Sequence, residues 1–237
     1  MKELDKLKEW IASSSNIVFF GGAGVSTESN IPDFRSIDGL YHTEYEYPPE
    51  KILSHSFYLN NRKEFFRFYK NKMLFPEALP NPAHEKLAEL EKCGRLKAVI
   101  TQNIDGLHQA AGSRNVMELH GSVLRNYCEV CNRFYSLKEI LEHEMPPRCS
   151  CGGFIKPDVV LYEESLNQET IRKTVDFISK AQVLIIGGTS LAVYPAAGLI
   201  DYYQGNKLIL INKTKTLRDV QADLALYGNI GEILGEC

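Results

Sequence analysis

The sequence predicts an α/β protein in which a Rossmann-like domain, built on a parallel sheet, carries a second and smaller domain. Short apolar runs rich in β-branched residues alternate with segments of helical periodicity, a pattern typical of a parallel sheet covered by helices on both faces. Two segments interrupt this alternation. The first, 31–75, is rich in Tyr, Phe and Pro, and the second, 126–154, holds four clustered cysteines. We therefore assign 1–30, 76–125 and 155–237 to the Rossmann-like domain, and 31–75 and 126–154 to the smaller one.

Each expected element has its own signal. Leu4, Leu7 and Ile11 recur at helical spacing and predict an amphipathic opening helix. The apolar run Ile17–Phe20 ends at two glycines and is typical of a buried strand. By the same criteria we expect strands at Ala98–Ile100, Val116–Leu119, Val159–Tyr162, Val183–Ile186 and Leu208–Ile211, and helices from Pro82 to about Glu91, from Gln168 to Lys180 and from Pro195 to about Tyr203.

Composition and charge exclude several classes of protein. Hydrophobic residues make up 44% of the 237 residues and charged residues 24%, which are ordinary values for a globular chain. The net charge of −3 gives no electrostatic reason to expect a nucleic-acid partner. Segment 1–10 lacks the layout of a secretory signal, and the run Ile17–Phe20 is far too short to span a bilayer. We therefore expect a cytoplasmic protein that binds neither nucleic acid nor membrane.

Four cysteines carry the strongest metal signal in the chain. Cys128 and Cys131 form one closely spaced pair and Cys149 and Cys151 a second, with a spacer that lets both pairs converge on one Zn²⁺ ion. Unligated cysteines, or two disulfides in an oxidised protein, are the alternatives. Four thiolates fill the zinc coordination shell and leave no position for water, so this zinc would be structural. The smaller domain is thus expected to combine a zinc-binding ribbon with a helical insertion.

Two glycine-rich turns indicate where a nucleotide binds. The run Gly21–Ser26 follows the first expected strand, and its glycines permit close approach to a pyrophosphate. Its spacing departs from the usual dinucleotide fingerprint, and many strand–helix turns are rich in glycine. A second turn, Gly187–Ser190, follows the strand Val183–Ile186, and α/β sheets bind ligands at such strand ends. Asn212 ends another strand, where it would either bond ribose hydroxyls or serve only as a turn residue.

Six blocks of sequence, taken together, resemble the sirtuins, a family of NAD-dependent protein deacylases. They occur in the family's order and cover the chain from about residue 20 to residue 212. Asn30 departs from the pattern, because the family usually has glycine there; Asn tolerates positive φ, so the turn is expected to survive. The blocks are Gly22–Ser26 with Ile31–Arg35, Thr101–His108, His120–Ser122, the four cysteines, Lys156–Val160 and Gly188–Leu191.

The resemblance implies a reaction and the residues that catalyse it. NAD would be the co-substrate, and the acyl group of a modified lysine would pass to ADP-ribose with release of nicotinamide. His120 would be the general base that deprotonates ribose hydroxyls, since imidazole titrates near neutrality, although a lone His is more often structural. Asn103 would orient the ribose and a water. Asp105, with the backbone of Ile104, would receive the nicotinamide amide, although this run of residues is also typical of a plain turn.

Further NAD contacts are implied by the same resemblance. Phe34 would cover the site that nicotinamide leaves and hinder its return. Arg35 would pair with phosphate or fix the loop, and a surface arginine is the alternative. The remaining implied contacts are Gln102 on the ribose, Ala23 and Thr27 on the phosphates, and Thr189, Ser190 and Asn212 on the adenosine.

The acyl-lysine would enter along an apolar strand. Val159, Val160 and Leu161 are implied to line its tunnel, although core packing predicts the same residues. The substrate backbone would pair as an added strand between Tyr162–Glu164 and the loop Ala192–Tyr194, with Val193 at the centre of that loop.

Acyl preference is implied by one helix of the insertion. Family members that prefer succinyl groups carry Tyr and Arg three residues apart in this helix. Phe66 and Tyr69 occupy those positions here, or Tyr69 and Lys72 if the alignment slips. An apolar tunnel favours acetyl or longer neutral acyl groups.

We therefore predict an NAD-dependent protein-lysine deacetylase that acts on acyl-lysine proteins or peptides and carries one structural zinc. A mono-ADP-ribosyltransferase would use the same NAD site but transfer the sugar to a protein. A non-catalytic NAD- or zinc-dependent binding module is the third reading, and the joint presence of His120, Asn103 and Asp105 argues against it.

Overall fold

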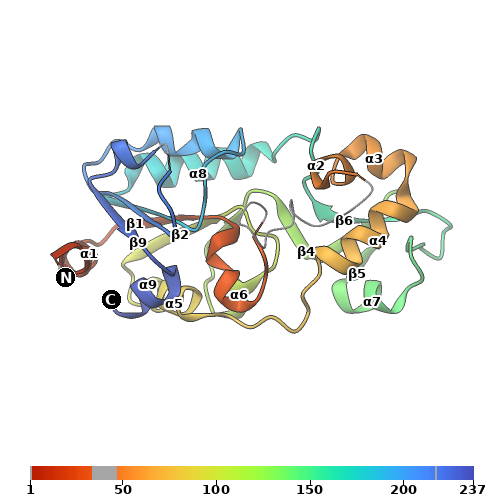
Figure 1. Cartoon of the computed structure of the whole chain (residues 1–237). Coiled ribbons are helices and arrows are strands. Elements are labelled where there is room, and N and C mark those ends of the chain that lie inside the picture. Colours follow the sequence, from red (N-terminus) through yellow and green to blue (C-terminus); the bar gives the residue numbers. More distant parts are fainter. Residues whose placement is uncertain (1, 34–46, 217) are drawn as a thin grey trace.

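The computed structural model describes residues 2–33, 47–216 and 218–237, which are organised around two sheets (Figure 1). All neighbouring strands of the larger sheet are parallel, and the smaller sheet is antiparallel. The predicted α/β class, with a parallel sheet and a smaller domain, is confirmed. The larger sheet has the strand order β3 (Val116–Glu118), β2 (Leu96–Thr101), β1 (Ile17–Gly21), β7 (Val183–Gly187), β8 (Leu208–Asn212) and β9 (Leu224–Tyr227).

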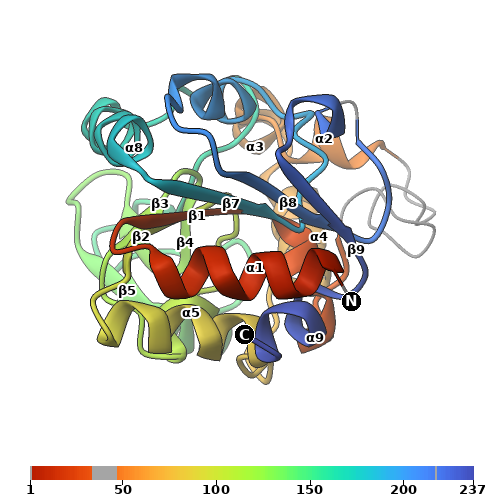
Figure 2. The same ribbon diagram turned by 90° about the vertical axis from the view of Figure 1, so that its left-hand side faces the viewer.

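Helices cover both faces of the larger sheet (Figure 2). Successive strand residues point to opposite faces, so Phe19 and Ile185 enter one apolar cluster while Phe20 and Ile186 enter the other. This layering explains why the strands are continuous apolar runs rather than alternating ones. On the first face lie α1 (Lys2–Ser13), α5 (Pro82–Lys92) and α9 (Ile230–Gly235), and on the second α8 (Gln168–Lys180) and the 3₁₀ helix η4 (Ala196–Tyr202).

The smaller domain joins the cysteine-rich ribbon to the helical insertion. Phe65, Phe66 and Tyr69 from the insertion are almost fully buried in one apolar cluster with Val123 and Val159 from the small sheet. The order of that sheet is β5 (Phe134–Ser136), β4 (Gly121–Cys128) and β6 (Ile155–Val159), and α7 (Leu137–Glu142) packs on it. The insertion forms α2 (Pro49–Ile52), α3 (His55–Asn60) and α4 (Arg62–Lys72), and the remaining short elements are η1 (Ala23–Val25), η2 (Thr27–Ser29), α6 (Leu107–Ala110) and η5 (Asp219–Gln221).

The strand expected at Val159–Tyr162 is wrong in both position and partner. β6 ends at Val159 and pairs with β4, from Gly121 opposite Val159 to Cys128 opposite Ile155. The apolar residues that follow β6 owe their character to the cavity described below rather than to a buried strand. The helix expected from Pro195 is a 3₁₀ helix, and β9 and α9 lie where no element was expected.

The domain boundaries stay a prediction. β4 crosses the proposed boundary between 125 and 126, and β6 belongs to the small sheet although it lies in the range assigned to the larger domain. None of the helices in the described ranges is long and apolar enough to cross a membrane.

Candidate active site

A cavity of about 1570 Å³ lies at the carboxyl ends of the central strands. The chain leaves β1 for β2 on one side and later adds β7 on the other, so this edge is the switch point at which α/β sheets bind ligands. Gly22 and Gly188, which follow β1 and β7, line the cavity. Val123 from β4 and Tyr69 from α4 line it as well, so both domains contribute to its wall.

The two glycine-rich turns touch each other beside this cavity. The Gly24 N–H donates to the Gly188 carbonyl over 2.8 Å. A Cβ on Gly24 would stand 2.8 Å from Gly188 Cα, and a Cβ on Gly22 would stand 2.8 Å from Thr189 Cβ, so both positions require glycine. The result is a stretch of bare backbone that a pyrophosphate can approach closely.

One serine links the two residues that were expected to handle the nicotinamide ribose. Ser26 Oγ donates to Asp105 Oδ2 over 2.7 Å and accepts from Asn103 Nδ2 over 3.0 Å. The other Asp105 oxygen accepts from Leu107 N at 2.9 Å. Sequence reasoning gave Ser26 no role; its only signal was a hydroxyl at the end of the first glycine turn.

His120 is held by the main chain at the meeting point of the two domains. Its Nδ1 lies 3.0 Å from the Gln102 carbonyl oxygen, which can only accept, so Nδ1 carries the proton and Nε2 the lone pair. Burial lowers the pKa of His120, and the hydrogen bond to Gln102 opposes that effect only in part. The imidazole is therefore neutral at neutral pH, with Nε2 as its basic atom. Gly121 follows at φ 76°, where a Cβ would collide with Asp158 O.

The strand ends at β2, β7 and β8 are joined by side-chain hydrogen bonds. Gln102 Nε2 donates to Thr189 Oγ1 over 3.1 Å, and Thr189 N donates to Asn212 Oδ1 over 3.0 Å. The Asn212 amide nitrogen is buried, and it has no hydrogen-bond partner among the described residues. A buried donor of this kind needs an acceptor, and a ligand hydroxyl would supply one.

The structure brings most of the predicted site residues together. Thr27 does not line the cavity in the described part of the chain; its hydroxyl donates to the Gly24 carbonyl over 3.0 Å and fixes the end of the turn. Phe34 and Arg35 lie outside the described residues, just after Asp33, which lines the cavity. The predicted residues that line it are Ala23, Gln102, Asn103, Ile104, Asp105, His120, Val159, Val160, Tyr162, Thr189, Ser190, Val193 and Asn212.

Helix α4 presents Tyr69 rather than Phe66 to the cavity. Tyr69 lines it, is 1% exposed, and its hydroxyl has no hydrogen-bond partner among the described residues. Phe66 packs in the core with its ring edge-on to that of Tyr69, at 6.2 Å between centroids, and is not among the lining residues of the described chain. Lys72, three residues after Tyr69, also lines the cavity.

The four cysteines converge at the far end of the small domain. Their sulfur atoms all lie within 4.8 Å of one another, with Cys128 and Cys151 3.4 Å apart and Cys131 and Cys149 3.6 Å apart. Sulfurs in a tetrahedral zinc site, with Zn–S bonds of about 2.3 Å, stand about 3.8 Å apart, so the cluster fits one Zn²⁺. The backbone N–H of Cys151 and the Tyr135 hydroxyl lower the pKa of Cys149, which favours the thiolate that zinc binds. Against the effect of the Gly153 N–H, the neighbouring thiols raise the pKa of Cys151.

Known proteins are similar to this chain over nearly its whole length. The model described as the Sir2 family matches residues 22–195. The NAD-dependent protein deacetylase of Clostridium tetani is 61% identical over 233 residues, which cover 97% of this chain and 94% of that protein. The protein of the same name from Clostridium perfringens is 59% identical over 238 residues, covering 99% and 98%.

Solved structures agree with the sequence comparisons. A structure described as the basis for the mechanism and regulation of Sir2 enzymes has a TM-score of 0.90 at 42% identity, covering 99% of this chain and 96% of that one. A Sir2 variant solved with deacetylated p53 peptide and 3'-O-acetyl-ADP-ribose has a TM-score of 0.89 at 37% identity, covering 98% and 96%. Sir2 with p53 peptide and NAD⁺ gives 0.87 at 37% identity, again covering 98% and 96%.

Proposed function

This chain belongs to the Sir2 family and is an NAD-dependent protein deacetylase, and we propose how its own residues divide the reaction. The enzyme consumes NAD, an acetyl-lysine and one water molecule, and it yields nicotinamide, O-acetyl-ADP-ribose and the free lysine. NAD supplies the activated ribose carbon that accepts the acyl oxygen. Side chains and backbone around the cavity must supply the general base, position the reacting groups and bind both substrates.

His120 is the general base. The hydrogen bond from Nδ1 to the Gln102 carbonyl leaves the lone pair on Nε2, and burial keeps the ring neutral at the pH at which it must accept a proton. Its position among the lining residues lets Nε2 meet a ribose hydroxyl. This geometry is the observation that supports the assignment most directly.

Asn103, Ser26 and Asp105 position the nicotinamide end. The chain of hydrogen bonds through Ser26 fixes both side chains, so neither has to be ordered when substrate arrives. Ser26 is a positioning residue in this scheme, and Asn103 and Asp105 face the reacting sugar and the leaving amide. We assign Ile104 a backbone role beside them.

The opposite side of the site holds the adenosine half of NAD. The bare backbone at Gly22–Gly24 and Gly188 suits the pyrophosphate, with Ala23 beside it. The amide nitrogen of Asn212, which has no partner among the described residues, suits a ribose hydroxyl, and Thr189 and Ser190 also line the cavity. Thr27 supports the phosphate turn through the bond from its hydroxyl to the Gly24 carbonyl. Phe34 stays proposed as the cover over the site that nicotinamide leaves, and Arg35 as a partner for phosphate or a support for its loop.

The peptide side of the cavity is apolar at its wall. Val159 and Val160 flank the tunnel for the acyl-lysine stem, and the Val160 N–H donates to the His120 carbonyl over 3.0 Å, which ties this wall to the base. We propose that the substrate backbone adds as a strand between Tyr162–Glu164 and the loop that contains Val193.

We also propose that the enzyme works in the cytoplasm and without nucleic-acid or membrane partners. Its cysteines are free thiols, and four of them form a cluster that must stay reduced to hold zinc. The net charge of −3 gives no electrostatic reason to expect phosphate-rich partners. Cell fractionation with an antibody against the chain tests the location, and a membrane-pellet signal would contradict it.

The decisive experiment follows all products at once. The purified enzyme is incubated with NAD and an acetyl-lysine peptide, and mass spectrometry monitors nicotinamide, O-acetyl-ADP-ribose and the peptide. We expect one nicotinamide and one O-acetyl-ADP-ribose for each acetyl group removed. ADP-ribose attached to the peptide would favour the mono-ADP-ribosyltransferase, and O-acetyl-ADP-ribose formation that does not depend on His120 would overturn the assignment of the base.

A further inference from the structure

Glu163 has an unusual backbone conformation at the edge of the cavity. Its φ is 75°, in the left-handed region that side chains other than glycine rarely adopt. A residue with a Cβ stays in this region only where its surroundings hold it there, and such positions gather at functional sites. Glu163 lines the cavity and lies in the segment Tyr162–Glu164, which we have proposed as one edge of the peptide site.

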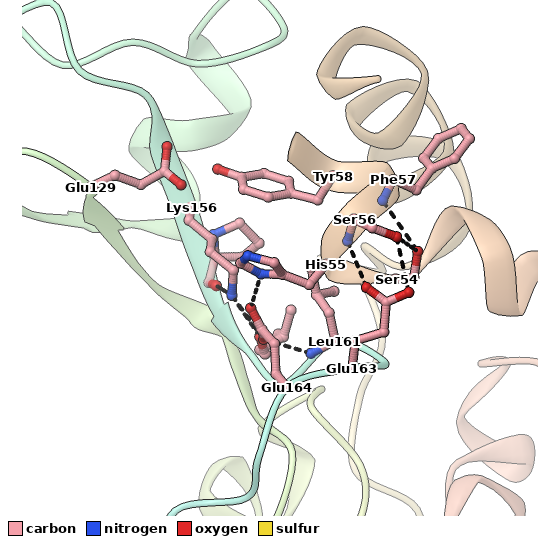
Figure 3. Close-up of polar contacts among 12 residues, drawn as sticks. Ser54, His55, Ser56, Phe57, Tyr58, Glu129, Lys156, Leu161, Glu163 and Glu164 are labelled. Carbon is pink, nitrogen blue, oxygen red and sulfur yellow. Dashed lines mark hydrogen bonds and ion pairs between the residues drawn. The ribbon is translucent and has the colours of Figure 1, made fainter. Parts of the chain in front are cut away.

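Two features hold this conformation: the turn bond from Glu164 N to Leu161 O, at 3.0 Å, and the contacts of the Glu163 carboxylate. One oxygen accepts from Ser56 N at 2.8 Å and the other accepts from Ser56 Oγ at 2.9 Å (Figure 3). Ser56 lies in the first turn of α3, where backbone N–H groups have no partner within the helix. The side chain of Glu163 therefore reaches from the peptide edge to the helical insertion and grips it by both oxygens.

The residues on either side of Glu163 are fastened to the same insertion. Tyr162 pairs with the chain before α3: its carbonyl accepts from His55 N at 2.9 Å and its N–H donates to Leu53 O over 3.0 Å. The Glu164 carboxylate accepts from Leu161 N at 2.8 Å and contacts His55 Nδ1 at 2.7 Å (Figure 3). Each residue of Tyr162–Glu164 thus forms a hydrogen bond that fixes the segment. Among the three, Glu163 alone has a strained backbone conformation, and its hydrogen bonds help to hold it there.

We propose that Glu163 is a positioning residue for the peptide substrate, and that its bond to Ser56 locks Tyr162–Glu164 in the shape that pairs with an extended acetyl-lysine peptide. The inference rests on the proposed pairing of the substrate backbone with this segment. A preformed edge binds without an ordering cost at the moment of association. Loss of the lock therefore weakens peptide binding and leaves NAD binding and the chemical step alone.

Three substitutions at Glu163 separate the lock from a direct contact with substrate. Glu163→Gly removes the carboxylate but accepts φ 75° without strain, so the KM for peptide rises about threefold. Glu163→Ala removes the carboxylate and keeps the strain, so the segment leaves its conformation and the KM rises about tenfold. Glu163→Gln keeps an acceptor for Ser56 N and restores most of the affinity. The values of kcat and of KM for NAD stay unchanged throughout.

Ser56→Ala tests the lock from the other side without touching the peptide edge. It removes one of the two donors, so the KM for peptide rises by about twofold, and the effect disappears when Glu163 is already glycine. Equal effects of Glu163→Gly and Glu163→Ala, together with a silent Ser56→Ala, would mean that the carboxylate touches the peptide itself and would overturn the lock. If the Glu163 variants also lost kcat, affinity for NAD and melting temperature, Glu163 would have a general structural role, and the proposed lock would again be refuted.

Peptides methylated at single backbone nitrogens around the acetyl-lysine separate this inference from the pairing on which it rests. In the unaltered enzyme, methylation at a paired nitrogen raises the KM for peptide. Where no methylated peptide loses affinity, the pairing itself is refuted. Where methylation weakens binding but the Glu163 and Ser56 variants bind peptide normally, the pairing stands and the lock alone is refuted.

Discussion

Mild acid should destabilise this protein through two histidines that are buried behind the active site. His84 on α5 and His108 on α6 are 0% and 1% exposed, and their ring centroids lie 4.7 Å apart. Burial lowers the pKa of His84 to about 4, although the Asp105 carboxylate works in the opposite direction. Burial also lowers the pKa of His108 to about 3, and neighbouring His84 adds to the effect. Both rings are therefore neutral in the folded protein above about pH 4.

The magnitude follows from proton linkage. In the unfolded chain both imidazoles titrate near their ordinary pKa of about 6.5, so below that pH the unfolded state binds protons that the folded state does not. Stability is then lost as the pH falls from about 6.5 towards the folded pKa values. Each proton contributes about 1.4 kcal/mol per pH unit, so two histidines give a slope of about 2.7 kcal/mol per unit. Over two units this approaches the total stability of many domains, about 5–15 kcal/mol.

Urea unfolding at a series of pH values from 7.5 to about 4.5 measures this slope. His108→Phe keeps a ring against Phe19 and cannot titrate, and His84→Gln keeps a side-chain acceptor for the Asn81 N–H. Each variant should reduce the slope by about one proton. Loss of zinc in acid affects all variants equally and cancels in the comparison. Identical slopes for the native protein and His108→Phe would refute the reasoning.

Three further predictions concern the site itself. His120→Ala should lower kcat by about 10²–10⁴ while the melting temperature stays unchanged, and near-normal activity of this variant would refute the role of His120 as the base. The kcat/KM of the native enzyme should fall only below pH 6.5, because the pKa of His120 is lowered. Cys128→Ala should reduce the metal content below one zinc per chain and lower the melting temperature. A metal-free preparation that is fully active would refute a structural role for zinc. Acetyl peptides should show a higher kcat/KM than succinyl ones, because a carboxylate beside Tyr69 would meet a neutral donor, the buried Tyr69 hydroxyl, which by itself does not offset the burial of a charge. Tyr69→Arg should narrow the gap. Faster desuccinylation by the native enzyme, abolished in Lys72→Met, would instead assign the acyl end to Lys72.

Local sequence patterns predicted the large sheet because strands that are buried on both faces are continuously apolar. Strands such as Val183–Gly187 are continuously apolar, and helix Gln168–Lys180 has the predicted bounds. The same reasoning failed after β6, because Val160 and Leu161 are apolar for the sake of a cavity wall and not of a sheet. No local rule distinguishes these two causes.

Contacts between turns that are distant in the sequence could not be predicted from local patterns, for a different reason. Ser26 bonds Asn103 and Asp105, which are more than seventy residues away, and a hydroxyl after a glycine turn has many other uses. The bond between Glu163 and Ser56 spans 107 residues. The Ser26 contacts exist only once the strand order is fixed, because the parallel arrangement brings the strand ends together. The Glu163 contact exists only once the helical insertion packs against the chain that follows β6.

The attachment of His120 makes it a clean test of the mechanism. Its own carbonyl accepts from Val160 N at 3.0 Å, and its neighbour Leu119 donates from its N–H to the Thr101 carbonyl over 2.9 Å. These bonds are formed by the main chain and stay in place when the side chain is changed. The backbone of Leu119 and His120 is thus bonded both to the NAD-binding sheet and to the wall that would contact the acyl-lysine. Any movement of one domain against the other must therefore move Nε2 relative to the ribose. Removal of the imidazole alone leaves that frame intact, and a loss of activity in His120→Ala then reports the missing base and not a displaced wall.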